Sequence, residues 1–189
     1  MPRIKRNTLI KGASGNYRGE YVYKVRGDET FIAAMPERDP NREKTENEKA
    51  FRRKSNAARA YARAAIADPL IKAFYEKKVS KTNSAFNVAF RDFQTYPTVD
   101  EIVTATYTGA LGSKISVFAD DDCEVTGVVV SIVSAAGVLI EEGPAVFDAF
   151  EGGAWIYTTT QNNPVLAGSK IKATAKDRPS HEGFKEVIL

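Results

Sequence analysis

The chain changes character at Pro97, and this change constrains its fold more than any single motif. Residues 1–97 contain 21 Lys and Arg against 11 Asp and Glu, a net charge of +10, whereas residues 98–189 contain 6 against 13, a net charge of −7. Proline disfavours helical backbone at the preceding residue, so Tyr96-Pro97 is a natural boundary. The sequence therefore predicts a basic domain over residues 1–97 and an acidic domain over residues 98–189.

The basic domain is predicted to contain a β-hairpin. Residues 20–26 alternate between two faces with the period of a strand, Gly27-Asp28 favours a turn, and residues 30–34 form a second strand-like run. A lone hairpin is marginally stable in water. We therefore expect it to pack on the helices that follow or on another subunit.

About three helices are expected after the hairpin. Asn41 is the expected cap of a helix over about residues 42–66, which are rich in good helix formers. Asp68 followed by Pro69 predicts the start of a short second helix. Phenylalanines and alanines at three- and four-residue spacing predict a third helix over about residues 82–93.

The acidic domain is predicted to be a β-sandwich. About seven β-rich runs are separated by turn residues at short intervals. Residues 114–119 and 170–175 alternate between small or β-branched apolar side chains and other types, which indicates burial on one face. The apolar end at residues 187–189 predicts a final paired strand, and an open edge there would recruit another chain. The predicted fold class is α+β.

A basic stretch of the first helix is the candidate contact site for a nucleic acid or a protein partner. Acidic residues are missing there, while Glu43, Glu46 and Glu48 accompany the basic residues at the helix start. The functional interpretation is a stripe that faces phosphate groups, and the alternative is an ordinary solvated helix face. The candidate residues are Arg52, Arg53, Lys54, Arg59 and Arg63.

The sequence offers little for catalysis or metal binding. It contains a single cysteine, Cys123, and a single histidine, His181, so one chain cannot assemble a Cys₂His₂ or His₃ zinc site. The acidic neighbours of Cys123 are expected to raise the pKa of its thiol, which disfavours a nucleophile, and His181 is expected in a solvated loop. No phosphate-binding glycine motif occurs. We therefore predict no enzymatic activity, no cofactor and no catalytic or metal-binding residues.

Two features of the acidic domain have alternative interpretations. Residues 120–122, three consecutive aspartates, suggest a calcium ligand set, but the EF-hand pattern is absent and an acidic turn is favoured. Trp155 lies in a strand-like run, so an anchor in the sandwich core is favoured over a platform for a ligand.

Two parts of the chain resemble known proteins. Residues 128–132, 137–141, 155–160 and 168–177 resemble bacterial immunoglobulin-like domains, without the paired cysteines of antibody domains. Residues 12–15, 19–24 and 40–41, followed by an Ala/Arg-rich helix, resemble short uncharacterised proteins of phages, prophages and Bacteroidetes genomes. Residues 39–45 depart from the N-P-x-T-x-x-Q helix start of those proteins. The resemblances imply an adhesive or structural module and a virion or other assembly component.

These observations predict a non-enzymatic structural or assembly protein, with a phage virion component as one candidate. Protein partners in a homo- or hetero-oligomer are expected, because the two halves carry opposite charges. A nucleic-acid-binding module that uses the basic helices is the alternative. No apolar run is long enough to cross a membrane, and no signal peptide follows Met1, so we expect synthesis in the cytoplasm and, for a virion component, association with the particle.

Overall fold

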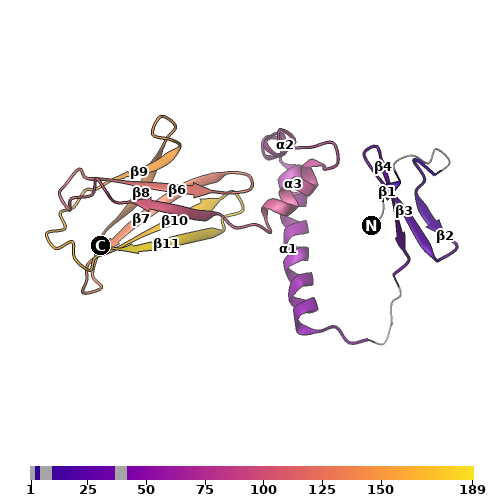
Figure 1. Ribbon diagram of the computed structural model, residues 1–189, viewed down its shortest axis with the longest axis horizontal. Helices are drawn as coiled ribbons and strands as arrows, with labels where there is room; N and C mark the ends of the chain where they lie inside the picture. Colours follow the sequence, from indigo (N-terminus) through magenta and orange to yellow (C-terminus); the bar gives the residue numbers. More distant parts are fainter. Residues whose placement is uncertain (1–2, 5–9, 37–41) are drawn as a thin grey trace.

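The computed structural model describes residues 3–4, 10–36 and 42–189. Within them the chain forms a small sheet, three helices and a large antiparallel sheet (Figure 1). The predicted α+β class is therefore confirmed. The division at residue 97 coincides with the passage from the last helix to the first strand of the large sheet, and as a domain boundary it stays a prediction.

The predicted hairpin forms the centre of a four-stranded sheet in the order β1-β4-β3-β2. Strand β3 (Tyr21–Arg26) pairs with β4 (Glu29–Ala34) through the expected Gly27-Asp28 turn. Strands β1 (Arg3–Ile4) and β2 (Gly15–Tyr17) extend it on either side, so the hairpin is not alone. Its turn approaches the loop after α2, because a Cβ on Gly27 would lie 3.3 Å from the Lys81 carbonyl oxygen.

The first helix begins later than the sequence pattern suggested. Helix α1 (Glu46–Ala67) is capped by Thr45, whose hydroxyl accepts from the Glu48 amide while the Glu48 carboxylate accepts from the Thr45 amide. This reciprocal capping box satisfies two backbone donors at once, which places the start at residue 46 rather than 42. The expected cap, Asn41, lies outside the described residues, and Thr45 is the observed one.

Two shorter helices pack on the second half of α1. Helix α2 (Pro69–Glu76) starts as predicted, with Asp68 accepting from the amides of Leu70 and Ile71. Helix α3 (Ala85–Asp92) is capped by Ser84. The first turns of α1, residues 46–54, extend beyond both partners and are largely exposed, as the ribbon shows (Figure 1).

The C-terminal half is one seven-stranded antiparallel sheet in the order β11-β10-β7-β8-β9-β6-β5. Its strands are β5 (Thr98–Val103), β6 (Lys114–Asp120), β7 (Val125–Val133), β8 (Leu139–Asp148), β9 (Ala154–Thr158), β10 (Lys170–Asp177) and β11 (Glu182–Ile188). The sheet curls until its two outer strands approach each other: Lys185 of β11 donates to the Asp100 carbonyl oxygen of β5, and Gly183 lies against Pro97. The final strand is therefore paired with β10, as predicted, and covered by β5.

The predicted alternation fills the interior of this curled sheet. Ile115 and Val117 of β6 and Ile171, Ala173 and Ala175 of β10 are fully buried. They belong to one apolar cluster with Val128, Val130 and Ile132 of β7. The coarse architecture is thus sandwich- or barrel-like, with its core between the two halves of a single folded sheet.

The helices and the large sheet contact each other directly. Cys123, in the β6–β7 loop, is buried in the same apolar cluster as Ala62 and Tyr75 of the helices. Lys78 donates to the Cys123 carbonyl oxygen over 2.7 Å, and Arg91 pairs with Asp122 at 2.7 Å. We call this contact region the junction.

Candidate functional site

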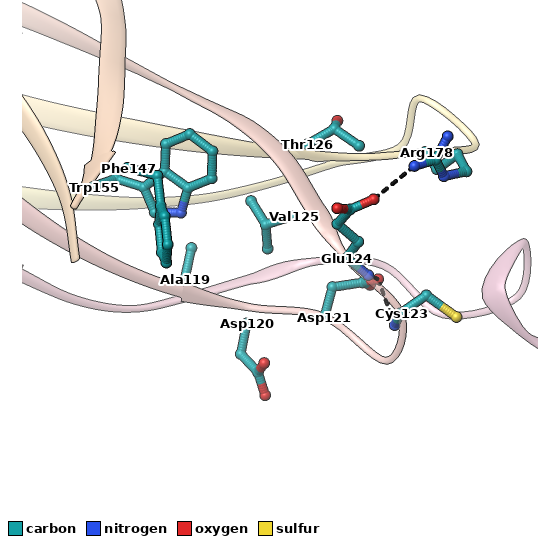
Figure 2. Close-up of a pocket in the computed structure, with 10 residues that line it drawn as sticks. All are labelled: Ala119, Asp120, Asp121, Cys123, Glu124, Val125, Thr126, Phe147, Trp155 and Arg178. Atoms are coloured by element: carbon teal, nitrogen blue, oxygen red, sulfur yellow. Dashed lines mark hydrogen bonds and ion pairs between the residues drawn. The ribbon is translucent and has the colours of Figure 1, made fainter. Parts of the chain in front are cut away.

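An open cavity of about 630 Å³ lies at the end of the large sheet next to the junction (Figure 2). Ala119 and Val125 lie in its middle, and Phe147 and Trp155 form an aromatic wall with ring centroids 5.4 Å apart. Acidic side chains from the β6–β7 turn form the opposite side. The cavity thus has an aromatic side and an acidic side, and Arg178 also lines it.

The aromatic wall belongs to a hairpin that projects from the sheet. Strands β8 and β9 pair Val146 with Ile156 and Phe147 with Trp155. Since side chains alternate along a strand, Phe147 and Trp155 face the cavity while Val146 and Ile156 face outward. We call residues 146–156 the apolar hairpin, and it stands out from the rest of the sheet in the ribbon (Figure 1).

The tip of the apolar hairpin exposes an aromatic ring completely. Phe150 is 101% exposed and Val146 is 71% exposed. The backbone beneath Phe150 is nevertheless ordered by Asp148, whose carboxylate accepts from the Phe150 amide at 2.9 Å. A structured turn therefore presents an uncovered phenylalanine to solvent, beside two partly exposed apolar residues of the same hairpin.

The stretch of sequence that contains the apolar hairpin is acidic. From residue 115 to residue 169 the sequence contains no Lys or Arg but eight Asp and Glu. Two of the acids, Asp148 and Glu151, flank Phe150 in the sequence, and the Lys114 amine lies 3.8 Å from the Glu151 carboxylate. A partner for this surface would need apolar and positively charged groups together.

The acidic turn beside the cavity is tied into the protein. Asp121 accepts from the amides of Cys123 and Glu124, and Glu124 pairs with Arg178 at 2.7 Å. Asp122 is paired with Arg91 across the junction. Asp121 and Asp122 therefore lie in the connection between β6 and β7, as favoured from the sequence, and Asp120 is the last residue of β6. Within the described residues no cluster of His, Cys, Asp and Glu has the geometry to hold a metal ion.

Trp155 has features of both interpretations, an anchor in the core and a platform for a ligand. It packs against the large apolar cluster and also lines the cavity. The β9 strand is short and its neighbour β8 runs out into the hairpin, so one edge of the indole stays accessible. The sequence identified the strand correctly but gave no sign that the sheet would open beside it.

Three of the five predicted contact residues share one face of α1. Residues seven and eleven positions apart lie on the same side of a helix, so Arg52, Arg59 and Arg63 form a row. Arg53 is also exposed, and in the described part of the chain neither Arg52, Arg53 nor Arg63 makes an ion pair. From residue 49 to residue 67 the sequence contains six Lys and Arg and no acid.

Lys54 is separated from that row. Its amine donates to the Gln94 carbonyl oxygen at 3.2 Å and lies 5.1 Å from the centre of the Tyr96 ring. It therefore supports the connection between α3 and β5. Phe51, one residue before Arg52, is 68% exposed, so the basic surface includes an uncovered aromatic ring.

The environment of Cys123 agrees with an unreactive thiol. Burial, together with the neighbouring Asp92 carboxylate, raises the pKa of Cys123 to about 12. The direction was predicted from the acidic neighbours, but burial is the larger cause, because the thiol is enclosed by the helices. A thiol of this kind is protonated at neutral pH and is a poor nucleophile.

The expectation of a solvated His181 was wrong. Its ring stacks on Tyr96 with centroids 4.3 Å apart, meets Phe93 edge-on at 4.8 Å, and bonds the buried Asp177 through Nδ1 at 3.0 Å. The loop after β10 folds back against the end of α3, which the sequence around His181 did not reveal. His181 therefore belongs to the junction and serves its packing.

A second cavity of about 600 Å³ lies between the small sheet and the start of α3. Arg26, Glu29 and Phe31 line it on one side and Thr82, Asn83 and Asn87 on the other. Sequence reasoning gave no signal for it, because its walls are far apart in the chain. Five of its six lining residues are polar or charged.

No protein-family model matches the chain, and no curated protein matches it. Among solved structures, the crystal structure of an engineered protein is similar at 16% identity, with a TM-score of 0.33. The similarity covers 64% of this chain and 27% of the engineered protein. None of the described helices is long and apolar enough to span a membrane.

Proposed function

We propose that this chain is a non-enzymatic structural or assembly protein that acts through protein–protein contacts. The observation that carries the proposal is the apolar hairpin, which projects from the sheet with Phe150 fully exposed. Isolated apolar side chains are normal on protein surfaces, whereas neighbouring ones on a projecting, ordered element mark an interaction site.

The charge distribution supports an assembly role. A chain with a positive half and a negative half attracts copies of itself in a head-to-tail orientation, and salt weakens that attraction between exposed charges. The sequence resemblance to phage and prophage proteins and to immunoglobulin-like modules is in keeping with a virion component built from such contacts. The phage setting and the immunoglobulin-like relationship remain part of this proposal.

The solution mass tests the proposal directly. Size exclusion with light scattering, over a range of protein concentrations and at low and high salt, should give a multiple of 20.7 kDa at low salt. High salt should reduce the mass, because the opposite charges are then screened. A mass of 20.7 kDa under every condition would contradict self-assembly.

Nucleic-acid binding through α1 is the second candidate function. The row formed by Arg52, Arg59 and Arg63, with no ion pair at Arg52 or Arg63, is the observation that favours it. Binding to phosphate groups releases counterions, so affinity for a DNA or RNA oligonucleotide should fall steeply as salt rises.

A fluorescence titration separates the two functions. Replacement of Arg52, Arg59 and Arg63 by Ala should weaken oligonucleotide binding and flatten its salt dependence. Binding that is unchanged in this variant would exclude the α1 surface. As a control, Lys170→Ala removes an exposed cation from the large sheet, away from α1.

A further inference from the structure

We propose that the apolar hairpin of one copy docks on the first turns of α1 of a second copy, so that the copies associate head to tail. This inference rests on the proposed assembly function and names the partner and both surfaces. It follows from the complementarity of two surfaces that the same chain carries.

The first surface is acidic and aromatic. Phe150 projects from the hairpin tip between Asp148 and Glu151, and no Lys or Arg occurs between residues 115 and 169. Asp148 makes no ion pair in the described residues, and only its Oδ1 atom accepts hydrogen bonds, from the amides of Phe150 and Glu151. Its negative charge is therefore available to a cation of a partner.

The second surface is basic and also carries an aromatic ring. Residues 46–54 of α1 extend beyond α2 and α3, and Phe51 is uncovered although it lies on the side of the helix that is buried further along. Arg52 and Arg53 follow without an ion pair. Glu46 and Glu48, the two acids within residues 46–54, are already paired with Lys49 and Arg42.

The two surfaces match in the properties that determine specificity. Docking would bring Phe150 against Phe51 and the hairpin carboxylates against Arg52 and Arg53. Aromatic residues and arginines dominate the binding energy of protein interfaces, and opposite charges fix the orientation. Within one chain the hairpin and α1 are not in contact, so the pairing must join different copies.

A contact between different surfaces on each copy is heterologous. Such a contact leaves one hairpin and one helix free at the ends of each oligomer, so it generates a ring if it closes and an open chain if it does not. Its mass distribution should therefore grow with concentration unless a ring forms.

Variants that alter one surface at a time test the two surfaces separately. Phe150→Ser and the double variant Arg52→Glu with Arg53→Glu should each raise the dissociation constant roughly tenfold or more, as expected for central interface residues. All three positions are exposed, so the fold should be unaffected, which circular dichroism and thermal unfolding would verify. Val138→Ser, at an exposed turn elsewhere on the large sheet, is the matched apolar control and should leave the mass unchanged.

A mixing experiment provides the sharper test. The Phe150→Ser copy keeps an intact α1 surface, and the Arg52→Glu, Arg53→Glu copy keeps an intact hairpin. Mixed together, they should form a 1:1 pair by light scattering that neither forms alone, and the pair should not extend further. Two monomers after mixing would overturn the pairing of these surfaces.

The outcomes for this inference and for the proposed function are distinct. A wild-type protein that is monomeric at every salt and protein concentration would contradict both the assembly function and the docking of the hairpin on α1. If the wild type is oligomeric and Phe150→Ser leaves its mass unchanged, only the docking of the hairpin on α1 is contradicted, and the assembly function is not. An oligomer that dissociates in the arginine variant but not in Phe150→Ser means that another acidic surface binds α1, and this result also overturns the inference.

Discussion

The hydroxyl of Tyr75 donates a 2.5 Å hydrogen bond to the Oδ2 atom of Asp92, and both side chains are completely buried. Tyr61 bonds the same hydroxyl at 2.7 Å, so α1, α2 and α3 meet at one polar point. The other carboxylate oxygen of Asp92 has no partner at hydrogen-bonding geometry, although the Cys123 thiol lies nearby. The buried Asp92 carboxylate of α3 is therefore linked to α1 and α2 through the Tyr75 hydroxyl.

Replacement of Tyr75 by Phe should destabilise the protein. The ring would keep its place in the helical cluster, but Asp92 would lose its only strong hydrogen-bond donor. Loss of one partner of a buried hydrogen bond costs about 1–3 kcal/mol, and the figure is higher when the remaining group is charged. Chemical denaturation followed by circular dichroism would measure the change. A Tyr17→Phe variant, at an exposed tyrosine, should differ by less than about 0.5 kcal/mol.

The contribution of Asp92 and Asp177 to the stability of the protein should fall as pH rises above about 3.8. Burial raises the pKa of both Asp92 and Asp177 above the ordinary value of 3.8. Below pH 3.8 both carboxyl groups are protonated in the folded and in the unfolded protein. Above it the unfolded chain loses protons first, so the free energy of unfolding declines until pH passes the raised pKa values.

An Asp92→Asn variant tests this pH dependence. Asn cannot ionise but still accepts the Tyr75 hydrogen bond, so the decline in unfolding free energy with pH should become shallower. Urea midpoints at several pH values would give the slope. Glu186→Gln, an exposed acid on β11, should keep the slope of the wild type. Equal slopes in the wild type and Asp92→Asn would show that Asp92 does not contribute.

The close approach of β5 and β11 depends on Gly183. A Cβ at this position would overlap the Pro97 carbonyl oxygen, which is backbone and cannot rotate away. Gly183→Ala should therefore destabilise the protein by about 1–3 kcal/mol, as overpacking does. Gly127→Ala is the matched control, since a Cβ on this strand glycine meets no atom within 4 Å. Thermal unfolding of the pair would show whether the curled sheet needs this contact.

The local parts of the fold could be predicted because their signals lie close together in the chain. Asp68-Pro69 started α2 as expected, and the alternation around Ile115 and Ile171 gave the buried face of β6 and β10. The predicted start of α1, directly after Asn41, is four residues too early, and Thr45 is the observed cap. The capping box with Glu48 was visible in the sequence and would have identified the correct residue.

The candidate site could be predicted only in part because long-range contacts create it. The basic residues of α1 were visible as a charge pattern, whereas the exposure of Phe150 depends on β8 and β9 extending beyond their neighbours. In the same way, the ring of His181 packs on Tyr96 and Phe93, which are about half the chain away in sequence. Neither relationship has a local sequence signature.

The reactivity of Cys123 should report on separation of the helices from the large sheet. Burial is the main reason that the pKa of this thiol rises to about 12, and the burying side chains come from the helices. At pH 8 the native protein should therefore react with iodoacetamide far more slowly than the protein unfolded in urea, whose thiol returns to its ordinary pKa of 9.0. Mass spectrometry of timed samples would give both rates.

Phe93→Ala removes a ring that packs on His181 and Tyr61, so this variant should speed alkylation of the native protein by loosening the junction. The control variant Phe184→Ala, on the exposed side of β11, should leave the alkylation rate unchanged. Rapid alkylation of the native wild type would instead mean that the β6–β7 loop opens without unfolding, so that the junction is not a stable contact.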